Sequence, residues 1–138
     1  MTSRPIGEDD LHAYVDGVLD GQRRAEVEAV LNAQPELRAR VARDIEARDA
    51  LRAALARPAE QEAGLHQRDI LASLDRLPDE QRAVILLVTI EEMSYADAAE
   101  TLGVPVGTVM SRMSRARARL REALSGEAAP VVHLRSVK

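Results

Sequence analysis

Apolar residues recur along most of this chain at intervals of three or four, which is the spacing of one face of an α-helix. Before residue 57, the pattern predicts three helices, at about residues 8–19, 21–33 and 35–56. After residue 64 it predicts four more, at about residues 67–76, 79–88, 95–102 and 106–124. The predicted fold class is therefore all-α.

Polar and helix-breaking residues mark the expected boundaries. Pro58 ends a helical pattern, and a polar stretch closed by Gly64 is typical of a linker. We therefore expect a helical domain at residues 1–57, a linker at 58–64, a second domain at 65–125 and a flexible tail at 126–138. Asp20 and Ser94 are candidate N-caps, and Gly103 suits the left-handed residue that ends a helix.

The first domain carries a long apolar stripe with two interpretations. It is either the core of an ordinary three-helix bundle or a groove that receives a partner helix. The periodicity of apolar residues does not distinguish these two interpretations. The candidate partner-binding residues are Leu11, Tyr14, Val15, Leu37, Val41, Ile45, Leu51 and Leu55.

Composition excludes several classes of protein. The chain of 138 residues has no cysteine, which rules out disulfides, thiolate zinc sites and cysteine nucleophiles. Aromatic residues are 1% of the sequence, while helix-favouring Ala, Leu, Arg and Glu dominate. No signal peptide or membrane-spanning run is present, so we expect a cytoplasmic protein. Because no catalytic cluster or phosphate-binding loop appears, we expect no enzyme and no cofactor.

Charge is unevenly distributed. The net charge is −4, but residues 106–121 carry five arginines and no acid. Such a basic stripe is either an electrostatic footprint for phosphate or a solvated helix face. The five are Arg112, Arg115, Arg117, Arg119 and Arg121.

The segment 94–124 has the pattern of a helix-turn-helix, with a short Ala-rich helix, a turn containing Gly103 and a long basic helix. On a helical wheel, Ser111, Ser114 and Arg115 lie opposite the apolar stripe, with arginines on both shoulders. This placement favours entry into a DNA major groove, and the alternative is a helical hairpin that touches no nucleic acid. The predicted buried stripe is Val109, Met113, Ala116, Leu120 and Leu124.

Four strings in the second half carry a family resemblance: LDRLPDEQR at 74–82, SYADAA at 94–99, LGVPVGTVMSR at 102–112 and SRAR at 114–117. With them, residues 65–123 closely resemble region 4 of bacterial extracytoplasmic-function (ECF) sigma factors. The resemblance implies binding of the promoter −35 element and docking on the β flap of RNA polymerase. Arg115 is the best candidate for a base contact. The implied DNA-binding residues are Thr108, Met110, Ser111, Arg112, Ser114 and Arg115, with Arg117 and Arg119 on the shoulders.

The first half resembles a second family, the cytoplasmic domain of anti-sigma factors, over about residues 8–56. The matching strings are LHAYVDG at 11–17, RRAEVE at 23–28 and PEL at 35–37. Many such domains carry a zinc motif, but Val30, Gln34 and Leu37 stand at the equivalent positions. We therefore expect the zinc-free type, with no metal ligands. The lone His12 is interpreted as a plain surface or packing residue.

The sequence does not determine how the two halves are arranged relative to each other. The anti-sigma-like half could pack on region 4 in cis and mask it, exchange with a second chain in a swapped homodimer, or bind another sigma factor independently. The chain could also be an artificial fusion, or an interaction module with no DNA binding of its own. Because sigma region 2 is absent from the sequence, we do not expect this chain to open a promoter by itself.

Overall fold

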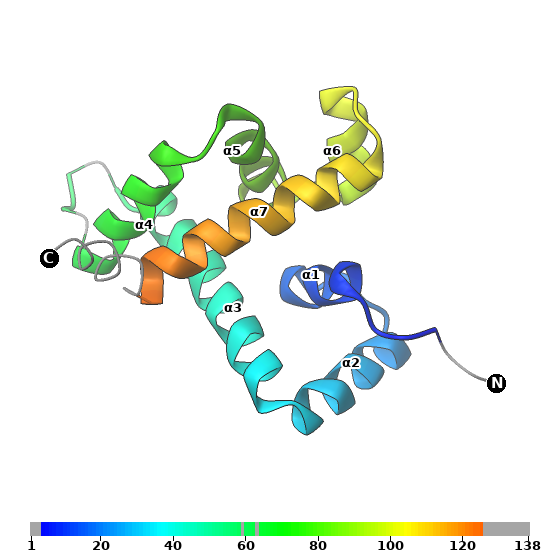
Figure 1. Ribbon diagram of the computed structural model, residues 1–138. Helices are drawn as coiled ribbons and strands as arrows, with labels where there is room; N and C mark the ends of the chain where they lie inside the picture. The colour runs from blue at the N-terminus through cyan, green and yellow to red at the C-terminus, as the bar shows by residue number, and fades with distance from the viewer. Residues whose placement is uncertain (1–3, 59, 63, 126–138) are drawn as a thin grey trace, which may run out of the picture.

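The computed structural model describes residues 4–58, 60–62 and 64–125, so the expected tail at 126–138 and two linker positions lie outside the described residues. The described part contains seven α-helices, one π-helical segment and no strand, which confirms the all-α prediction (Figure 1). Within it, no helix is long and apolar enough to cross a bilayer.

The first three helices are α1 (Glu8–Asp16), α2 (Gly21–Ala33) and α3 (Pro35–Ala56). The sequence predicted α1 to continue to residue 19, but it ends at Asp16. The cause is Gly17, which adopts the left-handed conformation with φ 74° and donates its N–H to the Tyr14 carbonyl at 3.1 Å. Asp20 caps α2 as predicted, because its carboxylate accepts the Arg23 N–H at 2.8 Å.

The second half contains α4 (Leu65–Arg76), α5 (Asp79–Ile85), the π segment η1 (Leu86–Ile90), α6 (Tyr95–Leu102) and α7 (Val106–Ser125). The sequence predicted one continuous helix at 79–88, whereas the structure changes to π geometry after Ile85. The Ser94 hydroxyl caps α6 by accepting the Asp97 N–H at 3.0 Å, and Gly103 ends α6 at φ 69°. Both predicted end residues are therefore confirmed.

Buried side chains form two clusters. The smaller cluster joins α1, α2 and the first half of α3 through Leu11, Val15, Val27, Leu31 and Val41. The larger cluster lies among α4–α7 and includes three residues from the second half of α3, namely Ala47, Leu51 and Ala54. The long helix α3 therefore belongs to both clusters and crosses the expected domain boundary.

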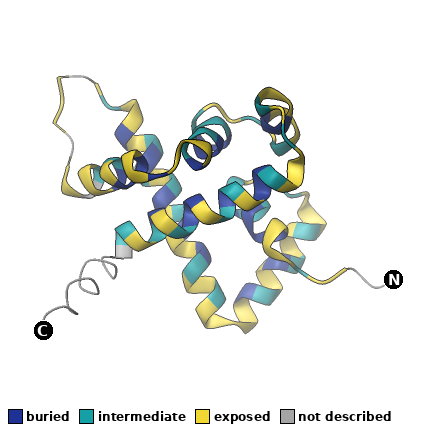
Figure 2. Cartoon of the chain, turned by 45° about the horizontal axis from the view of Figure 1, so that its top comes forward, coloured by how far each residue is buried: buried dark blue, intermediate teal, exposed yellow. Residues whose placement is uncertain are grey.

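Helix α7 runs through the middle of the molecule. It contacts α1 and α3 as well as α4, α5 and α6. Figure 1 shows α1 and α2 on one side of α7, with α5 and α6 on the other. Buried and exposed positions alternate along α7 (Figure 2), so this helix has faces packed against its neighbours and a face in solvent.

Candidate nucleic-acid interface

The helix-turn-helix consists of α6, a turn at residues 103–105 and α7. Ala98 and Ala99 are 0% and 5% exposed, and their small side chains allow α6 to lie close to α7. The predicted apolar stripe of α7 is confirmed. Val109, Met113, Ala116 and Leu120 are all buried, and Leu124 is partly buried.

The open face of α7 carries Ser111, Arg115 and Arg119, which are all exposed. They stand four residues apart, so they form one straight line on the helix surface. We call this line the open ridge. Thr108, Arg112 and Ser114 are half-buried beside it. Within the described part of the chain, Arg112, Arg115 and Arg119 form no ion pair, so their guanidinium groups are free to meet phosphates or bases.

Two residues of the predicted DNA-binding set lie on a different face of α7. Met110 and Arg117 are 7% and 2% exposed. Arg117 donates from Nη1 to His12 Nδ1 of α1 at 2.8 Å, and its Nη2 pairs with the Asp16 carboxylate. Neither side chain is open to solvent in this packing.

Arg121 lies one turn further along α7 and faces α3. Its Nε and Nη2 donate to the two carboxylate oxygens of Asp44 at 2.7 and 3.1 Å, a bidentate pair. Asp44 is 2% exposed. The arginines of α7 therefore divide between an open face and a face that binds the acidic N-terminal half.

Four polar side chains meet where α1 contacts α6 and α7: His12, Asp16, Tyr95 and Arg117. We call this group the polar seam. The Tyr95 hydroxyl donates to the Asp16 carboxylate, and burial together with that carboxylate raises the pKa of Tyr95 far above its usual range. Burial and the charge of Arg117 lower the pKa of His12.

Sequence reasoning missed the polar seam. It interpreted His12 as a plain surface or packing residue. The side chain is buried, as the packing interpretation allows, but its contact with Arg117 was not foreseen. One signal was available, because His12 and Asp16 lie four residues apart on a single predicted helix face. The partner of that face, Arg117, is more than a hundred residues away and could not be read from local spacing.

The candidate partner-binding stripe of the first half is mostly occupied within the chain. Leu11, Val15 and Val41 are buried in the smaller cluster, with Tyr14, Leu37 and Ile45 packed against it. Leu51 is buried in the larger cluster. Leu55 is 43% exposed and remains available to another molecule.

A cleft of about 670 Å³ lies between the end of α1, α3 and the helix-turn-helix. Val88, Met93 and Val106 supply apolar walls, and Arg52 and Glu92 supply charges. Arg52 donates from Nε to the Thr89 carbonyl in the π segment at 3.1 Å. Glu92 adopts a left-handed conformation with φ 59°, which is uncommon for a residue other than glycine. Both halves of the chain therefore line this cleft, which lies beside the left-handed residue Glu92 and the π segment.

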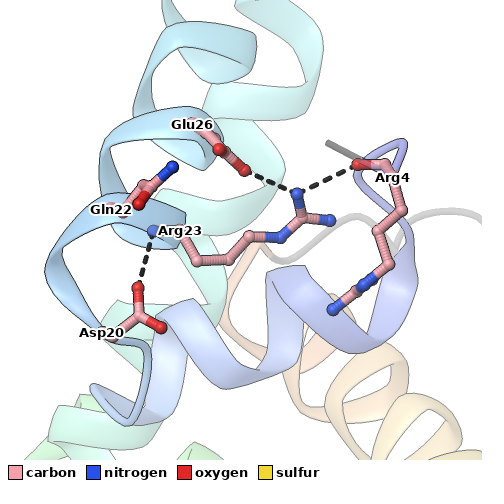
Figure 3. Close-up of a pocket in the computed structure, with 5 residues that line it drawn as sticks. All are labelled: Arg4, Asp20, Gln22, Arg23 and Glu26. Atoms are coloured by element: carbon pink, nitrogen blue, oxygen red, sulfur yellow. Dashed lines mark hydrogen bonds and ion pairs between the residues drawn. The ribbon is translucent and has the colours of Figure 1, made fainter. Parts of the chain in front are cut away.

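A second, smaller cleft near the N-terminus is lined by charged residues whose groups bind each other. Arg23 Nη1 donates to Glu26 at 2.6 Å and to the Arg4 carbonyl at 3.0 Å (Figure 3). Arg23 also pairs with Asp10 at 2.9 Å, and this contact holds the pKa of Asp10 far below its usual range. The network ties the chain before α1 to α2, which is a structural role. No group of His, Asp and Glu in the described residues could hold a metal ion.

Comparison with known proteins shows what the second half is similar to. Residues 67–120 match the family model described as Sigma-70, region 4. The chain is 49% identical over 57 residues to the ECF RNA polymerase sigma factor SigE of Mycolicibacterium smegmatis, covering 41% of this chain and 22% of that protein. It is 45% identical over 60 residues to the ECF sigma factor EcfG of Rhodopseudomonas palustris, covering 44% and 33%.

A third relative, the ECF sigma factor SigW of Bacillus subtilis, is 47% identical over 49 residues, which cover 36% of this chain and 26% of the relative. The match thus spans about a fifth to a third of these relatives. No solved structure matches the chain significantly. The family match does not reach residues 8–56, so the anti-sigma resemblance of that part stays a prediction. Residues 67–120, which contain the helix-turn-helix, are similar to region 4 of sigma-70-type factors.

Proposed function

We propose that this protein is a non-enzymatic regulator of bacterial transcription that acts in the cytoplasm, where its region 4 binds the promoter −35 element. The observation that carries the proposal is the open ridge, Ser111, Arg115 and Arg119, on the second helix of a helix-turn-helix within the region 4 match. That helix is the one that enters the major groove in helix-turn-helix proteins.

The ridge has the chemistry that groove entry requires. Arg115 lies at its centre, where a guanidinium can donate two hydrogen bonds to a guanine. Arg112 and Arg119 lie nearer the edge and are suited to phosphates, which fix the position of the helix without reading sequence. Ser111 is small enough to let the backbone of α7 approach the bases.

We further propose that the anti-sigma-like half is bound to region 4 in cis and covers only one flank of α7. The covered flank contains Arg117, which faces α1, and Arg121, which faces α3, with Met110 buried on the same side of α7. The open ridge is exposed while these contacts are made. The closed molecule is therefore competent to bind DNA, which separates this proposal from complete masking.

The cleft between the two halves supports docking on RNA polymerase. Its walls of Val88, Met93 and Val106 suit an apolar helix, such as one from the β flap. Val106 is 45% exposed, so burial by a partner would remove apolar surface from water. The arrangement leaves the open ridge on α7 free for DNA at the same time.

Fluorescence anisotropy with the whole chain tests DNA binding. The probes are a −35-type duplex and a scrambled duplex, each measured between about 50 and 200 mM salt. The Arg115→Ala variant should weaken binding to the −35 duplex by about 1–3 kcal/mol and lose the preference over the scrambled duplex. Arg119→Ala should weaken both duplexes equally and lower the salt dependence by about one charge.

The matched control is Arg38→Ala, which removes an exposed arginine of α3, a helix that carries no part of the open ridge. It changes the net charge by the same amount and should leave sequence preference intact. If Arg115→Ala and Arg38→Ala bind both duplexes alike, the base-reading role of Arg115 is wrong.

A second function is favoured by the burial of Met110 and Arg117, which removes two residues of the predicted DNA-binding set from solvent. In that case, the chain is a protein interaction module that docks on polymerase or a sigma factor without touching DNA. The discriminating result is whole-chain binding to the β flap, together with no salt-sensitive binding to either duplex.

A further inference from the structure

The contact between α1 and α7 depends on the polar seam. His12 is 2% exposed, and the side chains of Arg117 and Asp16 are 3% and 6% exposed. Because a guanidinium can only donate, the 2.8 Å contact requires His12 Nδ1 to accept from Arg117. The imidazole is therefore neutral in this packing, with its proton on Nε2.

Helix α3 is attached to the second half in a different way. Its Ala47, Leu51 and Ala54 belong to the larger apolar cluster. The buried apolar residues of α1, Leu11 and Val15, instead pack in the smaller cluster with α2 and α3. Helix α3 is held both by apolar burial and by the pair of Asp44 with Arg121, whereas α1 is joined to α7 through the polar seam. The attachment of α1 to α7 is therefore the part that a change of charge weakens most.

Charged groups from its own helix and from α3 and α7 act on His12. Its own helix supplies Glu8 and Asp16, and the carboxylate of Glu8 lies 3.8 Å from Nε2. Nε2 itself is buried without a hydrogen-bond partner among the described residues, because Glu8 is held by Arg40 at 2.7 Å. From the other helices, Asp44 of α3 and Arg117 of α7 act on His12 directly. The acidic groups near His12 are in turn bound by other side chains, with Arg40 on Glu8, Tyr95 on Asp16 and Arg121 on Asp44.

We propose that the polar seam is an acid-sensitive lock, in which protonation of His12 releases α1 from α7. A proton on Nδ1 would place an N–H donor directly against the donating Nη1 of Arg117. The neighbouring carboxylates attract the added charge, but the hydrogen bond to Arg117 is lost.

The direction of the pH dependence follows from linkage. Burial and Arg117 lower the pKa of His12 in the closed form, although Asp44, Glu8 and Asp16 oppose the shift. In the open form, the imidazole takes up a proton with an ordinary pKa of about 6.5. The closed form is therefore fully favoured above about pH 6.5 and loses stability as the pH falls below that value.

Opening would uncover the flank of α7 that carries Arg117. The Arg117 guanidinium would then add a positive charge beside the open ridge. If the proposed DNA binding holds, acidification strengthens it. The opening itself is measured without DNA, so failure of the lock and failure of the proposed function are distinguishable.

Tyrosine fluorescence reports the opening directly. The chain has two tyrosines and no tryptophan, so Tyr14→Phe leaves Tyr95 as its one fluorophore. In the closed form, the Tyr95 hydroxyl donates to the Asp16 carboxylate, a contact that quenches phenol emission. Emission should rise as the pH is lowered from about 7.5 to 5.5, with the opening constant increasing at most about tenfold per pH unit for one proton.

Hydrogen exchange locates the change. After correction for intrinsic exchange rates, the amides of α1 should lose protection at about pH 5.5, while those of α3 and α7 keep it. Equal protection of α1 at both pH values would overturn the lock.

Three histidine variants isolate the titrating group. His12→Gln retains an oxygen that accepts from Arg117 but takes up no proton, so its Tyr95 emission should be flat with pH. His66→Gln and His133→Gln remove the other two histidines and should preserve the original response. A response with the same midpoint in His12→Gln would refute the role of His12.

A direct titration covers the case in which His12→Gln fails to fold. The ring resonances of His12, followed by NMR in the unaltered chain, report its pKa. A value below about 6.5 supports the lock, and a value at or above it overturns the proposal, because linkage then favours the closed form at low pH.

Discussion

At the scale of single residues, burial rather than residue type decides what each side chain does. Arg115 and Arg117 stand two positions apart on α7, yet one is exposed and the other is 2% exposed against Asp16. Leu51 and Leu55 show the same contrast on α3. Leu51 is 0% exposed in the larger cluster, and Leu55 is 43% exposed.

This leucine pair gives a matched stability test. Leu51→Ala should lower the free energy of unfolding by about 2–5 kcal/mol, because it leaves a cavity in a closed apolar cluster. Leu55→Ala removes the same atoms from a site that is 43% exposed and belongs to neither buried cluster, so its effect should be clearly smaller, about 0.5 kcal/mol. Urea unfolding followed by circular dichroism measures both, and equal losses would contradict the shared core of α3 and α4–α7.

At the scale of elements, the ends of helices decide how α6 presents α7. Ser94 fixes the start of α6, and Gly103 reverses the chain at its end with φ 69°. No atom lies within 4 Å of a Cβ added at Gly103, so the backbone conformation is what requires glycine there. Gly107, in the first turn of α7, has equal space around it and no such conformation.

Alanine substitution at these two glycines should have opposite effects. Gly103→Ala should lower stability by about 1–2 kcal/mol, since a Cβ is strained in the left-handed region. Gly107→Ala should raise stability by about 0.4–1 kcal/mol, because it restricts the unfolded chain without strain in the helix. Thermal unfolding compares the two, and a stabilised Gly103→Ala variant would show that the turn does not need its left-handed residue.

At the scale of the whole molecule, α3 packs with both halves of the chain, so we expect the two halves to unfold together. Its second half contributes Ala47, Leu51 and Ala54 to the cluster that also holds Ile70 and Leu74 of α4. Its first half packs with α1 and α2 through Val41. The region 4 segment therefore does not contain all of its own core.

Truncation tests this dependence. The whole chain should unfold in one urea transition. A fragment of residues 65–138 should have a clearly lower midpoint, because it loses the apolar surface that α3 covers. A fragment that begins at residue 20 lacks α1 but keeps α3, so it should retain more of the stability. Equal midpoints for the 65–138 fragment and the whole chain would show that region 4 is self-sufficient.

The sequence by itself determined the local elements and the chemistry of the second half. Helical periodicity, the caps at Asp20 and Ser94 and the turn at Gly103 depend on neighbouring residues, so they could be read from the chain. The ends of α1 and α5 were placed wrongly. The left-handed Gly17 and the π geometry after Ile85 depend on backbone hydrogen bonds that periodicity does not report.

Only the tertiary structure decided how the two halves meet. The contact between His12 and Arg117 joins residues 105 positions apart, and the pair of Asp44 with Arg121 joins residues 77 apart. The sequence placed Arg115 opposite the apolar stripe and Arg117 on a shoulder, both as DNA contacts, but packing against α1 leaves Arg117 only 2% exposed. The physical reason is that local sequence sets which face of a helix is polar, whereas burial and charge pairing depend on which helix lies against that face.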